Sequence, residues 1–381
     1  KRVYYASYDV KDYLSQENVL LVAVAPGWYG MPKLRMQMEI AYTDGSATTL
    51  TANHLRAVTT GPTVYSTVFD GELYDARLEA PDIYKPSVPA GLMNKDWGLA
   101  HIADSPGGKM VSQKMEPIRV VDTLTPKIIT EPKPGVYVFD TEQNLAGWAS
   151  LTVEGERGRE ITLKFAETLY DDGLVNKENL RNAKATDTYI LKGEGVETWE
   201  PKFTYHGFRY VQVEGLPHAP KVGDIRVKIV RNAVAPVGKF HCSNELLNRI
   251  HRMVVATEAS NLHGVPTDCP QRDERMGWLN DLTVRIEQAV YNFDFSRFYA
   301  KFIDDIADTQ HEDGTITCVA PYRFGARPAD PVSASYLLLA WKSYEYYGNR
   351  NIIRDHYDGL KGWVDYLASR TQDGIVDYSY Y

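Results

Sequence analysis

Residues 268–281 read Asp268-Cys269-Pro270-Gln271-Arg272-Asp273-Glu274-Arg275-Met276-Gly277-Trp278-Leu279-Asn280-Asp281 and connect a proline-containing loop to a predicted helix. Four carboxylates, two arginines and one tryptophan stand within these fourteen residues: Asp268, Asp273, Glu274, Asp281, Arg272, Arg275 and Trp278. If the helix already begins at Glu274, then Glu274, Trp278 and Asp281 share one of its faces, because they are spaced at i, i+4 and i+7. A sugar could lie across such a face.

Glycoside hydrolysis needs the side chains that this face would present. An indole offers a flat apolar surface to the C–H groups of a sugar, and charged groups can hydrogen-bond its hydroxyls. A carboxyl group beside other carboxylates can have its pKa raised until it donates a proton. A structural alternative is open as well, since acids favour a helix start, arginines pair with them and Trp278 can pack in a core. Residue types and spacing alone favour the structural alternative.

Upstream of this segment the sequence has the period of β-strands. In the first region, apolar residues alternate with polar ones before the turn sequence Asp44-Gly45: Leu34, Met36, Met38 and Ile40. This pattern predicts a hairpin with one buried face. The strand period returns at 161–165, 208–213 and 225–229 and predicts a second β-sandwich. Between the two regions, clustered prolines predict a linker and a boundary near residue 125: Pro117, Pro126, Pro132 and Pro134.

After Pro236 the period changes to that of helices. Ser243 is expected to cap a first helix that carries its apolar residues on one side: Leu246, Leu247, Ile250 and Val254. Further helices are predicted over four ranges: 277–292, 296–310, 332–347 and 352–369. We therefore expect three domains, over residues 1–118, 119–235 and 236–381.

Composition argues against two classes of partner. The chain has a formal net charge of -8 and a pI near 5.7, and it lacks the stripe of Lys and Arg that nucleic-acid phosphates require. No apolar run reaches the roughly 18 residues of a membrane span, and the longest candidate, 19–25, has the length of a strand. We expect a soluble protein with no nucleic-acid partner and no membrane span.

The cysteines and histidines form no recognisable site. The three cysteines, Cys242, Cys269 and Cys318, are too few and too scattered for a disulfide framework or a zinc site. Cys269 has no neighbouring histidine to activate it and is interpreted as a packed thiol. Four histidines are interpreted as structural: His206, His251, His263 and His311.

The run 268–275, followed by Gly277, Trp278 and Asp281, resembles the signature of the bacterial α-L-rhamnosidases, an inverting glycoside hydrolase family. Four further segments are similar to that family: Ala25-Pro26-Gly27-Trp28-Tyr29, Tyr205-His206-Gly207-Phe208-Arg209-Tyr210, Asn261-Leu262-His263-Gly264 and Tyr291-Asn292-Phe293-Asp294. The resemblance covers essentially the whole chain. It implies a multidomain β + α fold, in which two antiparallel, jelly-roll-like β-sandwich domains precede the first part of an (α/α)6 six-hairpin barrel.

The resemblance also implies an activity, the removal of terminal α-L-rhamnose from rhamnose-containing oligosaccharides or glycosides with inversion, without a cofactor or metal. By position, Glu274 is similar to the general acid that protonates the glycosidic oxygen. Asp268, Arg272 and Asp281 resemble residues that hold the rhamnose hydroxyls, and Trp278 resembles the wall against the C5 methyl. An inverting reaction also needs a carboxylate that activates water about 6.5 to 9.5 Å from the acid. The resemblance places this base in a later part of the barrel.

The chain departs from the pattern of the family in two ways. Five predicted helices are fewer than half of the twelve in an (α/α)6 barrel, so we expect more than half of the barrel, and the start of the first sandwich, to be absent. The catalytic base is then expected beyond Tyr381. The family's Pro-Ala-Trp-Gly-Asp stretch is replaced by Arg327-Pro328-Ala329-Asp330-Pro331, which leaves Asp330 as a sugar contact without support from the motif.

Three functions stay open on this basis. Glu274 favours a rhamnosidase, or a portion of one, because a pure binding site gains nothing from a proton donor. The expected absence of the base favours a non-catalytic carbohydrate-binding protein or an inactive fragment. Another hydrolase or a phosphorylase on the same barrel is the third alternative, and a phosphorylase would need a phosphate-binding group that the sequence does not reveal. The aglycone, the oligomeric state and the compartment are not indicated.

Overall fold

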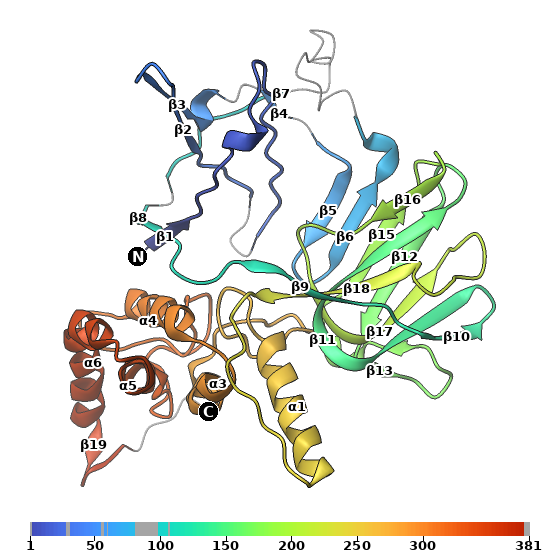
Figure 1. The fold of residues 1–381 in the computed structure, drawn as a ribbon. Helices are drawn as coiled ribbons and strands as arrows, with labels where there is room; N and C mark the ends of the chain where they lie inside the picture. The colour runs from blue at the N-terminus through green and yellow to red at the C-terminus, as the bar shows by residue number, and fades with distance from the viewer. Residues whose placement is uncertain are drawn as a thin grey trace.

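The computed structural model describes residues 2–27, 31–54, 57–58, 60–80, 98–105 and 107–376. A β-rich part is followed by a helical part, in the order that the sequence predicts (Figure 1). Trp28 and Tyr29, which belong to one of the segments that resemble the rhamnosidases, lie outside the described residues. Within the described ranges, no helix has the length and apolar character needed to cross a lipid bilayer.

A ten-stranded sheet forms the centre of the β-rich part. Its strands follow the order β5-β6-β15-β12-β17-β11-β18-β9, and β10 and β16 pair with β11 off this path. The bounds are β5 Thr63–Thr67, β6 Gly71–Asp75, β9 Ile118–Leu124, β10 Ile128–Lys133, β11 Val136–Glu154, β12 Glu160–Ala166, β15 Thr186–Ile190, β16 Val196–Trp199, β17 His206–Glu214 and β18 Ile225–Asn232. The predicted strands at 161–165, 208–213 and 225–229 are confirmed.

Alternate residues of these strands build one apolar core. In β12, Ile161, Leu163 and Phe165 are fully buried and point to the same side of the sheet. Burial of one such side chain contributes roughly 1.5 to 3 kcal/mol. Neighbouring strands complete the core with Phe139, Leu151, Phe208, Val211, Val213, Ile225 and Val227.

Strand β11 bends as it changes neighbours. It pairs first with β17 and then with β18, and its register with β17 shifts between Asp140 and Leu145. At Gly147, where β18 takes over, a Cβ atom would lie 1.8 Å from the carbonyl oxygen of Lys228. Only glycine therefore fits at this crossing, since any side chain would force the two strands apart.

The N-terminal region contributes strands to the same sheet. β5 and β6 form a hairpin, and β6 pairs in parallel with β15, where Leu73 lies opposite Thr188. At the other end of the sheet, β9 pairs with β18 and forms the edge strand. The two β regions thus share one sheet. The strand period does not reveal this pairing, because it depends on contacts between residues that are distant in the chain.

The predicted N-terminal hairpin is confirmed as β2 (Gln37–Ala41) and β3 (Ala47–Thr51), which pair antiparallel. Gly45 has the positive φ of 85° that the turn requires. The other pairs and short helices within the described residues are β1 Arg2–Tyr5 with β8 Lys109–Ser112, β4 Ala57–Val58 with β7 Gly98–Leu99, β13 Thr168–Leu169 with β14 Val175–Asn176, β19 Thr371–Gln372 with β20 Ile375–Val376, η1 Lys11–Tyr13, η2 Ala52–His54, η3 Ala76–Leu78 and η5 Glu178–Leu180.

The helices of the described chain are α1 Glu245–Ser260, α2 Leu279–Thr283, α3 Ile286–Asn292, α4 Ser296–Thr309, α5 Ser335–Tyr347 and α6 Arg350–Ser369. The cap of α1 is Asn244 rather than the predicted Ser243, because the Asn244 side chain accepts hydrogen bonds from the backbone N–H groups of Leu246 and Leu247. The predicted helix 277–292 is also corrected, since it starts later and is divided into α2 and α3.

Helix α4 is the centre of the helical part. Its core residues pack against α3, α5 and α6, with Phe298, Phe302 and Ile306 fully buried on α4 and Trp363 fully buried on α6. In contrast, α1 exposes a set of residues that we call the apolar face of α1: Leu246, Leu247, Ile250, Met253 and Val254. The exposed fractions of Leu246 and Met253 are 62% and 63%. The sequence correctly predicts that apolar residues gather on one side of this helix, but within the described chain that side stays open.

Charged side chains join the N-terminal strand to the helical part. Asp304 of α4 is bound by Lys114 at 2.7 Å and by His356 Nε2 at 3.2 Å. Arg2 of β1 donates to the Asp304 carbonyl at 3.0 Å and to Asp308 at 2.8 Å. Although burial acts to raise it, the hydrogen bonds from His356 and Lys114 and the charge of Arg2 lower the pKa of Asp304 to about 2.

Candidate active site

Residues 268–278 form a cross-braced loop, and helix α2 starts only at Leu279. Asp268 holds both ends, because its N–H donates to the Met276 carbonyl at 2.9 Å and its Oδ1 accepts from the Met276 N–H at 2.7 Å. Arg275 has a φ of 51° and Trp278 is extended, and neither conformation belongs to a helix. The prediction that Glu274, Trp278 and Asp281 share a helical face is therefore wrong.

Arg275 fastens this loop to the β-rich part. Its Nη1 donates at 2.7 Å to the carbonyls of both Val68 and Tyr205, and its side chain also reaches the carbonyls of Gln271 and Arg272. The guanidinium lies over the Tyr205 ring, 4.7 Å from its centroid. Burial lowers the pKa of Arg275, and four carbonyl contacts compensate the buried charge. These long-range contacts give the physical reason why the loop is not helical.

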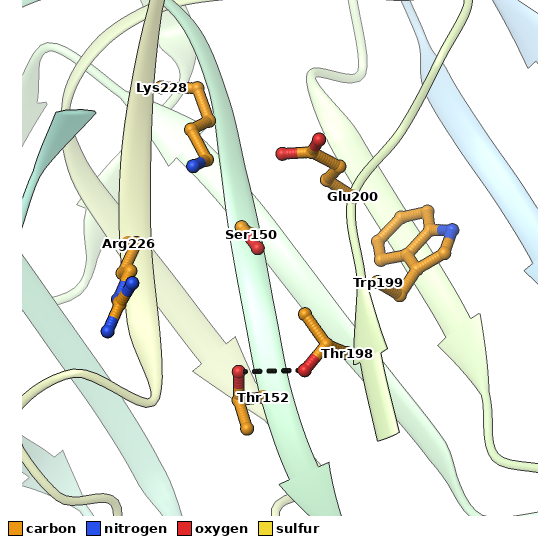
Figure 2. Close-up of a pocket in the computed structure, with 7 residues that line it drawn as sticks. All are labelled: Ser150, Thr152, Thr198, Trp199, Glu200, Arg226 and Lys228. Carbon is orange, nitrogen blue, oxygen red and sulfur yellow. Dashed lines mark hydrogen bonds between the residues drawn. The ribbon is translucent and has the colours of Figure 1, made fainter. Parts of the chain in front are cut away.

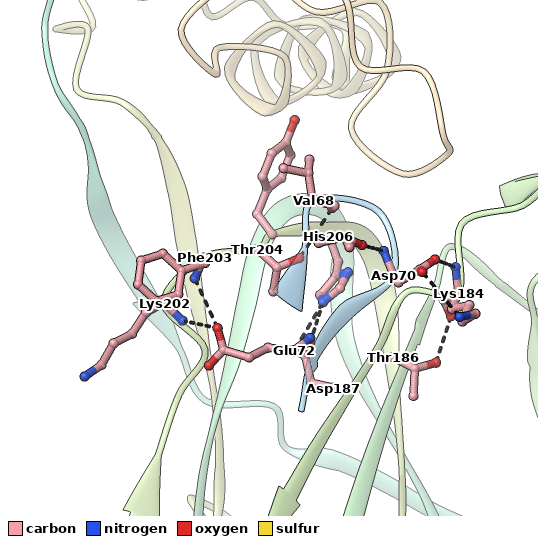
Figure 3. A network of polar contacts seen from close by, with 12 residues as sticks. Val68, Asp70, Glu72, Lys184, Thr186, Asp187, Lys202, Phe203, Thr204 and His206 are labelled. Carbon is pink, nitrogen blue, oxygen red and sulfur yellow. Dashed lines mark hydrogen bonds and ion pairs between the residues drawn. The ribbon is translucent and has the colours of Figure 1, made fainter. Parts of the chain in front are cut away.

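The Val68 carbonyl belongs to the turn between β5 and β6, which a buried polar network holds in place (Figure 3). Glu72 accepts hydrogen bonds from the N–H groups of Lys202 and Phe203 at 3.2 and 3.3 Å. Burial raises the pKa of Glu72 to about 6. The hydroxyl of Thr204 donates to the Val68 carbonyl at 3.4 Å. The network thus holds in place the Val68 carbonyl, which accepts a hydrogen bond from Arg275.

His206 completes this network from β17. Its Nε2 lies 3.1 Å from each carboxylate oxygen of Asp187, and its ring stacks on Phe165 at 4.2 Å. His263 stacks on Tyr205 at 3.9 Å, and burial lowers the pKa of His263 to about 3. Both rings are packed in the interior, which confirms the interpretation of these two histidines as structural.

β17 also touches the loop directly through Gly207. A Cβ atom there would lie 2.7 Å from Pro270 Cγ and 2.9 Å from the backbone nitrogen of Gln271. The close approach of the two backbones explains why glycine is needed, although its φ is ordinary. The candidate site is therefore built on the junction between the sheet and the helical part.

Glu274 is held by two guanidinium groups. Its side chain is 14% exposed, and its Oε2 lies 2.8 Å from Arg272 Nε and 3.1 Å from Arg181 Nη1. Arg272 Nη2 also lies 3.8 Å from Asp268 Oδ2, so that Arg272 stands between the two carboxylates. Three of the predicted site residues are thus brought together.

Asp268 is deeper than Glu274, with a side chain that is only 4% exposed. Burial, with a smaller contribution from Glu274, raises the pKa of Asp268 above its ordinary value. Its Oδ2 is buried and makes no hydrogen bond within the described residues. Asp268 can therefore act on a ligand only if the ligand reaches this inner oxygen.

A metal ion fits this group poorly. Asp268, Cys269 and Glu274 bring one potential ligand atom each within 4.8 Å of one another. Burial, together with Asp268, raises the pKa of the Cys269 thiol to about 12, whereas metal binding needs the thiolate. Arg272 already supplies a positive charge at the same place. The prediction that Cys269 is a packed thiol is confirmed.

Trp278 and Asp281 lie at the start of α2. Trp278 is partly buried, forms a bridge with Val319 and meets the Phe324 ring edge-on, with the centroids 6.2 Å apart. Asp281 is exposed and makes no hydrogen bond or ion pair with any part of the chain that the structure describes. Asp330 lies in a turn, where its carboxylate accepts from the Val332 N–H at 3.4 Å. The structure does not bring Asp281 into the cluster around Glu274.

Three models of one protein family match the sequence in the same order as these parts. They are described as an alpha-L-rhamnosidase N-terminal domain over residues 1–122, a bacterial alpha-L-rhamnosidase concanavalin-like domain over 130–231, and a bacterial alpha-L-rhamnosidase 6 hairpin glycosidase domain over 235–380. This chain belongs to the bacterial α-L-rhamnosidase family. The resemblance seen in the sequence is confirmed, and the fold joins β-rich domains to a six-hairpin glycosidase domain.

Similar proteins from several organisms carry the family's name. An alpha-L-rhamnosidase of Streptomyces avermitilis is 36% identical over 99% of this chain and 38% of its own length. A structure of the rhamnosidase from Dictyoglumus thermophilum has a TM-score of 0.88 at 42% identity and matches 93% of this chain and 40% of that one. The Streptomyces avermitilis enzyme in complex with L-rhamnose has a TM-score of 0.90 at 34% identity, over 98% and 37%. The chain spans about two fifths of the length of these relatives.

Two residues next to the rhamnosidase motif were not found by sequence reasoning. Arg181, and with it Asn182, comes from the loop before β15 and reaches the motif from the sheet. The Asn182 side chain donates to Asp273 Oδ2 at 3.0 Å. No spacing rule could have found these residues, since each partner lies about ninety positions away in the chain. The one local signal is the concentration of Lys, Arg and Asn between β14 and β15.

Figure 2 shows a polar hollow on the sheet. It has a volume of about 500 Å³ and is lined by Ser150, Thr152, Thr198, Trp199, Glu200, Arg226 and Lys228. The hydroxyls of Thr152 and Thr198, which are paired on β11 and β16, lie 3.2 Å apart. None of the predicted site residues lines this hollow, and the chemistry of the family motif offers no role for it.

Proposed function

We propose that the protein carrying this chain is a glycosidase that removes terminal, non-reducing α-L-rhamnose from rhamnosides with inversion of configuration. The observation that supports this most directly is the cluster of Glu274, Arg272 and Asp268 within the family motif. The substrate is a rhamnose-containing oligosaccharide or glycoside. No cofactor is required by this chemistry.

We assign Glu274 as the general acid. Both guanidinium groups contact Oε2, so Oε1 is the oxygen that can carry the proton toward the glycosidic oxygen. When the bond breaks, the proton passes to the leaving group and Glu274 becomes a carboxylate. Arg272 then stabilises that carboxylate, because its Nε already lies in hydrogen-bonding position.

We assign the sugar contacts to Asp268, Arg272, Asp281 and Trp278. Arg272 uses Nε for Glu274, and the other donors of its guanidinium fork can bind a hydroxyl. The indole of Trp278 is the apolar wall against the C5 methyl. Asp281 faces solvent and is available to a ligand, whereas Asp268 would offer its buried Oδ2.

The water-activating carboxylate is assigned to none of these residues. Asp268 lies within 4.8 Å of Glu274, which is closer than the roughly 6.5 to 9.5 Å that leaves room for water in an inverting site. We place the base in a later helix of the six-hairpin domain. The same assignment explains the open apolar face of α1, which further helices of that domain would cover.

We also propose the domain limits 1–118, 119–235 and 236–381. Two separate apolar cores support the second limit, one around Phe165 in the sheet and one around Phe302 in the helices. Pro236 lies between them, where it bridges to Phe293. At the first limit, β9 begins at Ile118 and already pairs with β18.

A non-catalytic carbohydrate-binding protein is the alternative, and one experiment separates the two. The full-length protein is assayed against a flavonoid rhamnoside and against nitrophenyl α-L-rhamnoside, together with its Glu274→Gln variant. The glycosidase predicts release of rhamnose, which falls sharply in the variant. Binding of L-rhamnose without any release of it by the unaltered protein would favour the alternative.

A further inference from the structure

A short loop between β14 and β15 carries Arg181 to the candidate acid. The loop is anchored on both sides of Arg181, because Leu180 and Ala183 are buried in the core of the sheet. Lys177 joins the two ends of the loop, because its Nζ donates to the Lys184 carbonyl at 2.5 Å. The backbone that carries the exposed Arg181 side chain therefore has little freedom to move.

Arg181 has an unusual backbone conformation. Its φ is 57° and its ψ is -116°, a region that non-glycine residues rarely occupy. Ala185, at the end of the loop, also has a positive φ, of 41°. Such strain persists only where the surroundings over-determine it, and it is often found at functional sites. The strain aims two consecutive side chains, Arg181 and Asn182, at Glu274 and Asp273.

The charged and titratable groups that face Glu274 within the described residues come from two elements. Its own loop supplies Arg272, Asp268 and Cys269. The sheet supplies Arg181 alone, at 3.1 Å. Arg272 is shared with Asp268, whereas Arg181 makes no other ion pair in the described chain.

We propose that Arg181 is a positioning residue of the general acid, which holds Oε2 of Glu274 and thereby directs Oε1 toward the glycosidic oxygen. The proposal rests on the proposed role of Glu274. A charge-assisted hydrogen bond restricts the orientation of the carboxyl group that it binds. Arg181 therefore lets the sheet contribute to a reaction whose motif lies in the helical part.

The expected effect is moderate because Arg181 is 53% exposed. Exposed ion pairs are weak, so the loss of Arg181 should lower kcat on a natural rhamnoside only about 1.5- to 5-fold. The loss should be smaller on nitrophenyl rhamnoside, whose leaving group departs without protonation.

The test uses Arg181→Met and Arg181→Lys in the full-length protein, with a flavonoid rhamnoside as substrate. kcat and KM are measured separately on this substrate and on nitrophenyl α-L-rhamnoside. We expect kcat on the flavonoid rhamnoside to fall in Arg181→Met and to recover in part in Arg181→Lys, with a smaller fall on the nitrophenyl substrate. Arg226→Met, which removes a cation that lines the polar hollow of the sheet, is the control and should leave kcat unchanged.

The outcomes separate the two proposals. An equal loss of kcat on both substrates, with no recovery in Arg181→Lys, would mean that the residue only supports the fold, and the inference would be overturned. An equal loss in Arg226→Met would show a general effect of charge and would overturn it as well. If Glu274→Gln lost no more activity on the flavonoid rhamnoside than on nitrophenyl rhamnoside, the proposed function itself would fail.

Discussion

Glu274 is the residue on which the proposed chemistry depends most. With Oε2 bound by two arginines, replacement by Gln keeps the size of the side chain but removes the proton. Glu274→Gln in the full-length protein should lower kcat on natural rhamnosides by about 10²- to 10⁴-fold, the usual scale of proton-transfer catalysis. The loss should be much smaller for nitrophenyl rhamnoside, whose leaving group departs without protonation. Equal losses on both substrates would show that Glu274 only binds.

Trp278 should discriminate between sugars. Trp278 is partly buried, its backbone bridges to Val319 and its indole meets the Phe324 ring, so the side chain can form a wall of the site. One methyl group in such a pocket contributes only about 1 to 3 kcal/mol. Trp278→Ala should therefore raise KM for rhamnosides roughly 5- to 150-fold, with a smaller change in kcat. Phe324→Ala removes only the edge contact and should change KM less. Unaltered kinetics in Trp278→Ala would remove the indole from the site.

Gly207 of β17 allows a direct test of how the sheet positions the motif. In Gly207→Ala, the new methyl would meet Pro270 and the backbone of Gln271, and something must shift. We expect the free energy of unfolding to fall by about 1 to 3 kcal/mol and kcat to fall with it, because the loop carries Glu274. Urea denaturation and a rhamnoside assay measure both quantities.

The matched control for Gly207 is Gly61→Ala, the same substitution at a position with no atom within 4 Å of the new methyl group. It should leave stability within about 0.5 kcal/mol of the original value. If Gly207→Ala were as stable and active as Gly61→Ala, the sheet would not hold the loop in the way described.

The strands and helices show which parts of the fold follow from sequence alone. β12 was predictable because Ile161 to Phe165 alternate strictly, and the period of α4 was equally clear. The start of α2 was not, because Arg275 reaches carbonyls of Val68 and Tyr205, and such tertiary contacts override local helix propensity. The parallel pairing of β6 with β15 and the reach of Arg181 to Glu274 also join distant residues. Sequence reasoning located the motif but not its supports.

At the scale of the whole molecule, Asp304 links β1, α4 and α6. Its pKa of about 2 in the fold is below the ordinary value of 3.8, so its ion pairs stabilise the fold above about pH 4. This contribution, about 2 kcal/mol, should be lost as the pH falls from about 4 to about 2. Asp304→Asn should be less stable than the unaltered chain near neutral pH, and the difference should shrink in acid, as measured by urea denaturation.

Asp305, the next residue, provides a control of opposite sign. Burial raises its pKa to about 6, above the ordinary value of 3.8. Asp305 therefore contributes its full stabilisation of the fold below about pH 4, and this stabilisation is lost as the pH rises through 6. Asp305→Asn should abolish the fall in stability as the pH rises through about 6. It should leave the loss of stability in acid, which Asp304 causes, unchanged. A common pH dependence in the two variants would contradict the assignment of the charges.

The last expectation concerns residues 1–381 as a separate protein, which we expect to hydrolyse rhamnosides at no appreciable rate. Glu274 can supply a proton, but Asp268, the carboxylate beside it, lies within 4.8 Å and is too close to act as an inverting base. An acid without its base loses several kcal/mol of transition-state stabilisation. A nitrophenyl α-L-rhamnoside assay tests this directly, and robust turnover by a monomer would show that the base lies within these residues.

The apolar face of α1 gives the same segment a second property that can be measured. Met253 and Leu246 are each more than half exposed, and apolar surface favours association by about 25 cal/mol per Å². We expect residues 1–381 to self-associate in light scattering, and Leu246→Lys with Met253→Lys to reduce this without loss of stability. Val196→Lys and Val222→Lys, which replace exposed apolar residues of β16 and of the turn before β18, are the matched control and should change association less. If residues 1–381 remained a monodisperse monomer at high concentration, the apolar face of α1 would be stable in contact with water. The argument that further helices cover this face would then fail.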